Sequence, residues 1–137
     1  MQDLKRLLQE GAENLQIELS AHQLEQFMAY LQLIMRWNKT YNLTAVKDPK
    51  QIVIRHFLDS IAVAPHISGG RILDVGAGAG LPGIPLALLY PLVQFVLLDS
   101  NGKKTRFMQQ VVAELNLPHV EVAKSRVELF FTEQKFD

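Results

Sequence analysis

The residues best suited to chemistry are an acid and a cluster of glycines at the end of one short apolar run. The run, residues 71–75, reads Arg-Ile-Leu-Asp-Val and predicts a β-strand; the glycines after it are Gly76, Gly78, Gly80 and Gly83. Glycine lets the backbone turn sharply, and it lets a ligand reach the main chain where a Cβ would collide. A plain connection from strand to helix needs one or two glycines. The cluster therefore indicates a ligand-binding loop.

Two classes of cofactor compete for this loop, and the position of the acid separates them. Residues 78–83 match the dinucleotide pattern G-x-G-x-x-G. The predicted strand ends at Val75, however, so the turn begins at Gly76 and the frame reads Asp-x-Gly-x-Gly-x-Gly from Asp74. An acid ahead of the first glycine repels a pyrophosphate but suits the ammonium and sulfonium of S-adenosylmethionine. A nicotinamide-dependent oxidoreductase and a non-catalytic cofactor-binding module remain the alternatives.

A second acid, Asp99, ends the next predicted strand, residues 94–99. The carboxyl ends of neighbouring parallel strands meet at one edge of a sheet, where a carboxylate can accept hydrogen bonds from both hydroxyls of a ribose. The alternative role for Asp99 is N-cap of the following helix. Ser125 and Glu128 follow a third predicted strand, 120–123, where an adenine would lie; they also fit a capping box, and the two interpretations are compatible.

Three basic residues, Lys103, Lys104 and Arg106, lie in the first turn of the helix predicted after Asp99. Positive charge at the start of a helix opposes the helix dipole and costs some stability. A phosphate backbone near the ligand edge of the sheet would account for the cluster, and a solvated lysine pair is the alternative. We therefore take the three residues as candidates for contact with a nucleic-acid phosphate backbone.

Other kinds of reactive site find little support in the residue types. The chain has no cysteine and its four histidines are dispersed, so we expect no metal site and no Cys-His or Ser-His-Asp nucleophile. Arg55, His56 and Asp59 share a helix face, and an Arg-Asp pair beside a core histidine explains them better than catalysis does. The sequence identifies no catalytic residue.

The elements before the loop are predicted to be helical. Apolar residues recur at helical spacing from 4 to 15, and Ser20 with Gln23 forms a capping-box signal for a second helix. Asp48 followed by Pro49 predicts the start of a third helix. The segment 37–44 between the last two is rich in Asn and Thr, so we expect it to end the second helix and form a loop.

The pattern changes at residues 69–70, a glycine pair, after which strands alternate with helices. That order predicts right-handed βαβ units and a parallel sheet. We expect an α/β fold with an N-terminal helical subdomain over residues 1–68 and the first half of a Rossmann-like domain over residues 69–137. Only three strands of that domain are predicted, so the sheet is expected to be incomplete.

Composition agrees with a globular protein of 137 residues, with 48% apolar and 20% charged residues and a net charge of zero. Balanced charge gives no overall basic field, and the N-terminus lacks the apolar block of a signal peptide, so the cytoplasm is the expected compartment. Residues 75–98 carry no charge and are long enough to span a bilayer. Three prolines interrupt this stretch, so we expect no membrane helix.

Four segments together resemble one family across nearly the whole chain. They are residues 37–44 (Trp-Asn-Lys-Thr-Tyr-Asn-Leu-Thr), 55–60 (Arg-His-Phe-Leu-Asp-Ser), the glycine loop at 74–83, and 98–100 (Leu-Asp-Ser). The glycine loop alone would indicate a class I methyltransferase. The order and spacing of all four segments resemble the ribosomal RNA small subunit methyltransferase G family, once called glucose-inhibited division protein B.

The resemblance implies transfer of a methyl group from S-adenosylmethionine to N7 of guanine 527 in bacterial 16S rRNA, alone or in the small ribosomal subunit. By position it implies cofactor contacts at Gly76 and Leu81 and, near the adenine, at Val127 and Glu128. With an RNA substrate implied, the basic residues Lys103, Lys104 and Arg106 become candidates for RNA contact. The family continues beyond the equivalent of Asp137 into further strands. We therefore expect this chain to be a fragment or a truncated product that is inactive alone.

Overall fold

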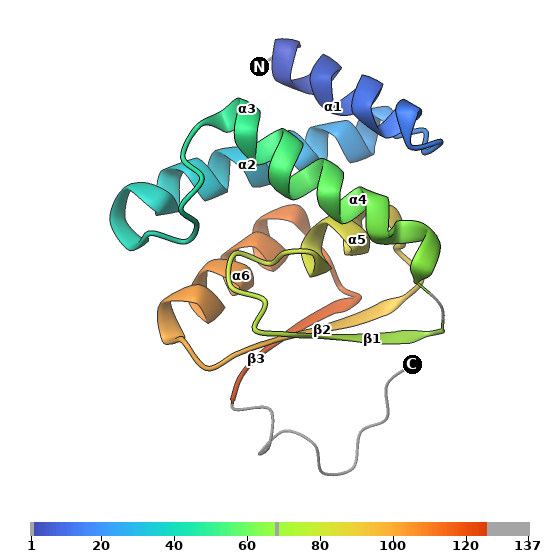
Figure 1. Cartoon of the computed structure of the whole chain (residues 1–137). Helices are drawn as coiled ribbons and strands as arrows, with labels where there is room; N and C mark the ends of the chain where they lie inside the picture. Colours follow the sequence, from blue (N-terminus) through green and yellow to red (C-terminus); the bar gives the residue numbers. More distant parts are fainter. Residues whose placement is uncertain (1, 68, 126–137) are drawn as a thin grey trace.

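The computed structural model describes residues 2–67 and 69–125, and its helices lie over one face of a small parallel sheet (Figure 1). The helical part consists of α1 (Gln2–Asn14), α2 (Ala21–Tyr41), α3 (Pro49–Ile52), the π-helical turn η1 (Val53–Leu58), α4 (Asp59–Val63) and the 3-10 turn η2 (Ala64–His66). The sheet part consists of β1 (Arg71–Val75), α5 (Gly83–Leu89), β2 (Gln94–Asp99), α6 (Gly102–Leu115) and β3 (Val120–Lys124).

The sheet brings the ends of its strands to one edge. All pairing is parallel in the order β1-β2-β3, and Asp74 is in register with Leu97 while Asp99 is in register with Lys124. The expected strands 71–75 and 94–99 are confirmed, and the third extends one residue beyond the prediction. Within the described residues, no strand pairs with the outer edge of β1.

The helix starts follow the capping signals in the sequence. The Ser20 hydroxyl accepts a hydrogen bond from Gln23 N at 3.0 Å, and Gln23 Oε1 accepts one from Ser20 N at 2.9 Å. A helix begins at Pro49 as expected, but the Asp48 side chain makes no capping hydrogen bond. This third helix also widens into the π-helical turn η1, which carries the buried Phe57 into the core.

The expectation that the chain leaves the helix at residue 37 is wrong, because α2 continues through Tyr41. Tertiary packing outweighs the weak helix propensity of this segment. Trp37 packs edge-on against Phe107 of α6 with ring centroids 5.5 Å apart, and the buried Asn38 Oδ1 accepts a hydrogen bond from Thr44 N at 3.1 Å. Asn42 ends the helix in the left-handed conformation, with φ at 47°.

A cluster of aromatic rings joins the helical part to the sheet part. Tyr30 of α2 stacks on Phe57 with centroids 5.2 Å apart and lies 6.4 Å from Phe107 of α6. These rings are fully buried, and the buried side chains of both parts form one continuous hydrophobic cluster. Across residues 2–67 and 69–125, no helix combines the length and apolar character needed to cross a membrane.

Candidate functional site

The glycine loop folds over the end of β2 in a conformation that favours glycine. Gly76, Gly78 and Gly80 have φ angles of 69°, 59° and 93°, which L side chains rarely adopt. The N–H groups of Gly76 and Ala77 both donate to Leu98 O, at 2.8 and 3.1 Å. The loop is therefore pinned to the carboxyl edge of the sheet, where open α/β sheets bind ligands.

The glycines of the loop divide into two pairs by what surrounds them. A Cβ on Gly76 would meet no atom within 4 Å, and one on Gly78 would approach no atom closer than 3.9 Å. A Cβ on Gly80 would overlap Ile84, and a Cβ on Gly83 would overlap Leu97 and the Asp74 carboxylate. Gly76 therefore faces open space that a ligand can enter and Gly78 is uncrowded, whereas Gly80 and Gly83 are required by packing within the protein.

Asp99 links the loop to the start of α6. Its Oδ2 accepts a hydrogen bond from Gly78 N at 3.0 Å, and its Oδ1 accepts one from Asn101 N at 2.8 Å. Asp99 is not the N-cap of α6, because Asn101 holds that position and accepts from Lys103 N and Lys104 N. A carboxylate has about four acceptor sites, so the Asp99 oxygens retain capacity for the hydroxyls of a ligand.

Asp74 holds the far end of the loop from within a half-buried position at the end of β1. Its Oδ2 accepts a hydrogen bond from Gly83 N, the first residue of α5, at 3.0 Å. Burial raises the pKa of Asp74 to about 6; the Gly83 hydrogen bond opposes this rise and the charge of Asp99 adds to it. Asp74 is therefore a structural anchor of the loop as well as a candidate ligand for a cation.

Tyr30 is a site residue that sequence reasoning missed. Its phenol, on α2 of the helical part, is fully buried and donates a hydrogen bond to Ala79 O in the middle of the loop at 2.5 Å. Burial raises the pKa of Tyr30 well above its usual value of 10.0, and the negative charge of Asp74 adds to that rise. Tyr30 therefore stays protonated as a donor, and no local motif around it could have revealed this contact.

The three basic candidates lie in different surroundings on α6. Lys103 and Arg106 are exposed, and Lys104 is half-buried. The Lys104 Cδ lies 3.9 Å from the position that a Cβ on Gly78 would take, so its stem runs beside the loop. The Lys103 Nζ lies instead over the ring of Tyr41, at 5.4 Å from the ring centroid.

Leu81 faces the helical part rather than the sheet edge. A surface groove of about 280 Å³ lies between the loop and the π-helical region, lined by Arg55, His56, Asp59, Ser60, Val63, Leu81 and Pro82. Arg55 and Asp59 do not form the expected ion pair. Among residues 2–67 and 69–125, the ion pair that forms joins Lys5 to Glu25. His56 contacts Thr44 Oγ1 at 2.8 Å, and burial lowers its pKa.

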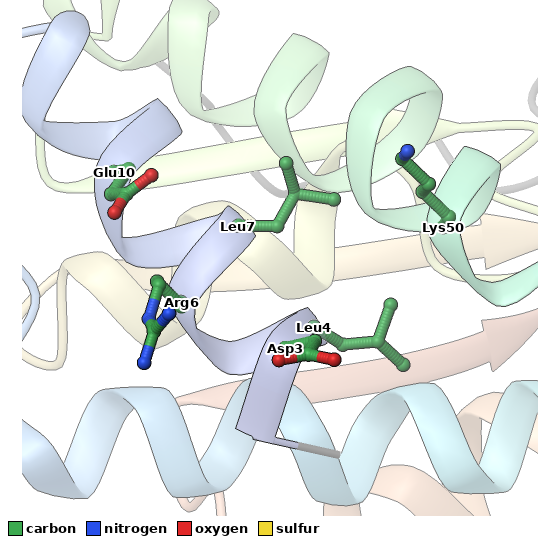
Figure 2. Close-up of a pocket in the computed structure, with 6 residues that line it drawn as sticks. All are labelled: Asp3, Leu4, Arg6, Leu7, Glu10 and Lys50. Atoms are coloured by element: carbon green, nitrogen blue, oxygen red, sulfur yellow. The ribbon is translucent and has the colours of Figure 1, made fainter.

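Other expected and observed features lie outside this region. Val127 and Glu128 fall beyond the described residues. In the described part of the chain, no group of three or more His, Asp or Glu side chains is placed to hold a metal ion. A separate pocket of about 460 Å³ lies between α1 and α3. Figure 2 shows its lining, with the Leu4 and Leu7 side chains directed toward α3, which carries Lys50. Its lining contains no residue of the loop or the sheet.

Comparison with known proteins decides the family. The family model described as rRNA small subunit methyltransferase G, GidB, matches residues 23–137. The chain belongs to the rRNA small subunit methyltransferase G family. Family members named ribosomal RNA small subunit methyltransferase G from Ectopseudomonas mendocina (strain ymp) and Enterobacter sp. (strain 638) are 57% and 52% identical, over 95% and 98% of this chain. The chain spans 62% and 63% of the lengths of those two relatives.

The GidB fold also resembles a solved methyltransferase structure. Coclaurine N-methyltransferase, determined bound to N-methylheliamine and SAH, aligns with a TM-score of 0.55 at 16% identity, over 99% of this chain and 47% of that one. This likeness confirms the expected class I methyltransferase fold.

The role of Tyr30 predicts how the loop responds to loss of one hydroxyl. Tyr30→Phe keeps the stacked ring but leaves Ala79 O without its donor, so the free energy of unfolding should fall by about 1–3 kcal/mol. Amide hydrogen exchange in the loop should accelerate. The matched control is Tyr90→Phe, which removes a 3.1 Å bond to Ala64 O away from the loop. Unchanged loop exchange in Tyr30→Phe would contradict the anchoring role.

The raised pKa of Asp74 predicts a dependence of stability on pH. Between about pH 4 and pH 6 the folded carboxyl holds its proton while the unfolded one loses it, so stability falls as pH rises through this window. The fall should reach at most about 3 kcal/mol, because one pKa unit is worth about 1.4 kcal/mol. Asp74→Asn should remove this slope and keep the bond to Gly83. Urea unfolding of both proteins at pH 4.5 and pH 7 measures the difference, and parallel pH profiles would refute it.

Proposed function

We propose that the protein carrying this sequence transfers a methyl group from S-adenosylmethionine to N7 of guanine 527 in 16S rRNA. Membership of the rRNA small subunit methyltransferase G family supports a methyltransferase acting on small-subunit rRNA. The specific atom and nucleotide rest on the resemblance of the sequence motifs. Because the chain spans under two thirds of the first relatives, the complete activity is proposed for the whole protein, in the cytoplasm.

The observation that carries the proposal is the uncrowded loop backbone, open at Gly76 and hydrogen-bonded to Asp99 at Gly78. Room without a Cβ, together with a carboxylate that retains acceptor capacity, fits the ribose end of S-adenosylmethionine. The Asp74 carboxylate is proposed to face the ammonium of the cofactor. Gly80 and Leu81 are proposed to shape the loop around it, and Val127 and Glu128 to contact the adenine.

The proposed reaction requires the protein mainly to position the two reacting groups. Bound S-adenosylmethionine supplies an electrophilic methyl group on its sulfonium. Guanine N7 has a free lone pair and no proton to remove, so the site needs no general base. The protein must hold N7 in line with the methyl group, about 3 Å away, and exclude water. This fits a site whose two acids accept hydrogen bonds from backbone N–H groups, while His56, in the groove that Leu81 lines, is bonded to Thr44.

The two alternatives from the sequence gain no support. The structure ends β1 at Val75 and begins the turn at Gly76, so the frame Asp-x-Gly-x-Gly-x-Gly is the one the loop adopts. A nicotinamide-dependent oxidoreductase and a module without activity would both also have to account for a family match to methyltransferases over residues 23–137.

The proposal predicts a large effect at Asp99. Asp99→Ala in the full-length protein should weaken S-adenosylmethionine binding about ten- to a hundredfold, since a charge-assisted hydrogen bond is worth roughly 1.5–3 kcal/mol. Isothermal titration calorimetry measures the Kd. The control is Asp48→Ala, which removes an exposed carboxylate that makes no capping hydrogen bond. Wild-type protein that binds NAD and does not bind S-adenosylhomocysteine would reject the proposed function.

A further inference from the structure

One contact between the two parts of the fold joins two exposed side chains, Tyr41 and Lys103, and Lys103 is close in the chain to Asp99 of the proposed site. The last turn of α2 carries Tyr41, whose residue surface is 38% exposed, and the first turn of α6 carries the exposed Lys103. The Lys103 ammonium lies over the Tyr41 ring, 5.4 Å from its centroid. Tyr41 is in turn supported by Trp37, one helical turn earlier, at 5.5 Å between centroids.

The Lys103 ammonium forms no ion pair with any residue in the described part of the chain, and the start of α6 adds further positive potential there. A tyrosine ring attracts a cation without neutralising it, so the charge remains available to an anion. Lys103 is therefore an exposed cation whose side chain is directed over the Tyr41 ring.

The location of this cation relates it to the proposed site. Lys103 follows Asp99 by four residues, and the intervening Asn101 is bonded both to the backbone of Lys103 and, through its own N–H, to Asp99. The backbone of Lys103 is thus joined through Asn101 to the carboxylate proposed to hold the ribose. Its neighbour Lys104 differs, because its stem runs beside Gly78 instead of over the ring.

We propose that Tyr41 is a positioning residue that presents Lys103 to a phosphate of the RNA next to the target nucleotide. This inference rests on the proposed function. A free lysine must give up much side-chain entropy when it binds a phosphate, and the ring removes part of that cost beforehand. The RNA surface accordingly spans both parts of the fold, with α2 supplying the support and α6 the charge.

A double-mutant cycle on RNA binding tests the proposal. The full-length protein is titrated with a 16S rRNA transcript at several salt concentrations, as wild type, Tyr41→Leu, Lys103→Ala and the double variant. An exposed cation–π contact is worth about two- to fivefold in an equilibrium, so Tyr41→Leu should weaken binding by that factor. Lys103→Ala should reduce the salt slope by about one contact. The double variant should bind no more weakly than Lys103→Ala alone.

Three controls separate this role from the others. Tyr41→Phe keeps the aromatic face and should bind RNA as wild type does. Tyr41→Leu combined with Lys104→Ala should show additive losses, because Lys104 does not contact the ring. S-adenosylmethionine affinity, measured by calorimetry on every variant, should not change with Tyr41→Leu.

The remaining outcomes of these experiments would contradict the proposal in different ways. Additive losses for Tyr41 and Lys103 would overturn the proposal and indicate that Tyr41 contacts the RNA itself, as a stacked base would. Loss of S-adenosylmethionine binding with Lys103→Ala would also overturn it, since the anion would then belong to the cofactor. A wild-type protein that binds the cofactor and methylates 16S rRNA while the cycle shows no coupling defeats this inference alone. A wild-type protein that binds no rRNA defeats it together with the proposed function.

Discussion

The hydrogen bond from Tyr30 to Ala79 O is the interaction on which the arrangement of the site depends. The phenol cannot shift without disturbing the rings of Phe57 and Phe107, which belong to the shared core. A close-packed interior tolerates few alternative positions for a side chain of this size. The loop is therefore fixed by the centre of the protein, and the helical part contributes directly to the geometry of the proposed cofactor site.

Two carboxylates at one sheet edge would repel each other, and the fold offsets this with backbone donors. Asp99 accepts from Gly78 N and Asn101 N, and Asp74 accepts from Gly83 N. These donors belong to the loop itself and to the starts of the two helices that follow it. The acids thus fix the loop to the starts of α5 and α6, and a cationic ligand at the proposed site would further reduce the repulsion between them.

Local signals in the sequence were sufficient for the elements and for part of the site. The alternation of apolar runs and turn residues predicted β1 and β2 to the residue, and the acid before Gly76 predicted the frame of the loop. The continuation of α2 to Tyr41 escaped prediction because Trp37 gains its stability from Phe107, seventy positions away in the chain. Tyr30 escaped for the same reason. The boundary between residues 68 and 69, and the roles of Val127 and Glu128, stay predictions.

Helix α2 reaches from the end of α5 to the start of α6 as a single element of 21 residues. At its start, Gln23 Nε2 donates to Leu88 O at the end of α5; at its end, Tyr41 contacts Lys103 at the start of α6. A continuous helix of this length is a rod of roughly 30 Å. No break in its hydrogen bonding separates the two ends. Tyr30 and Tyr41 therefore stand about 16 Å apart on one continuous helix, so a single rigid element sets the spacing between the glycine loop and the Lys103 surface.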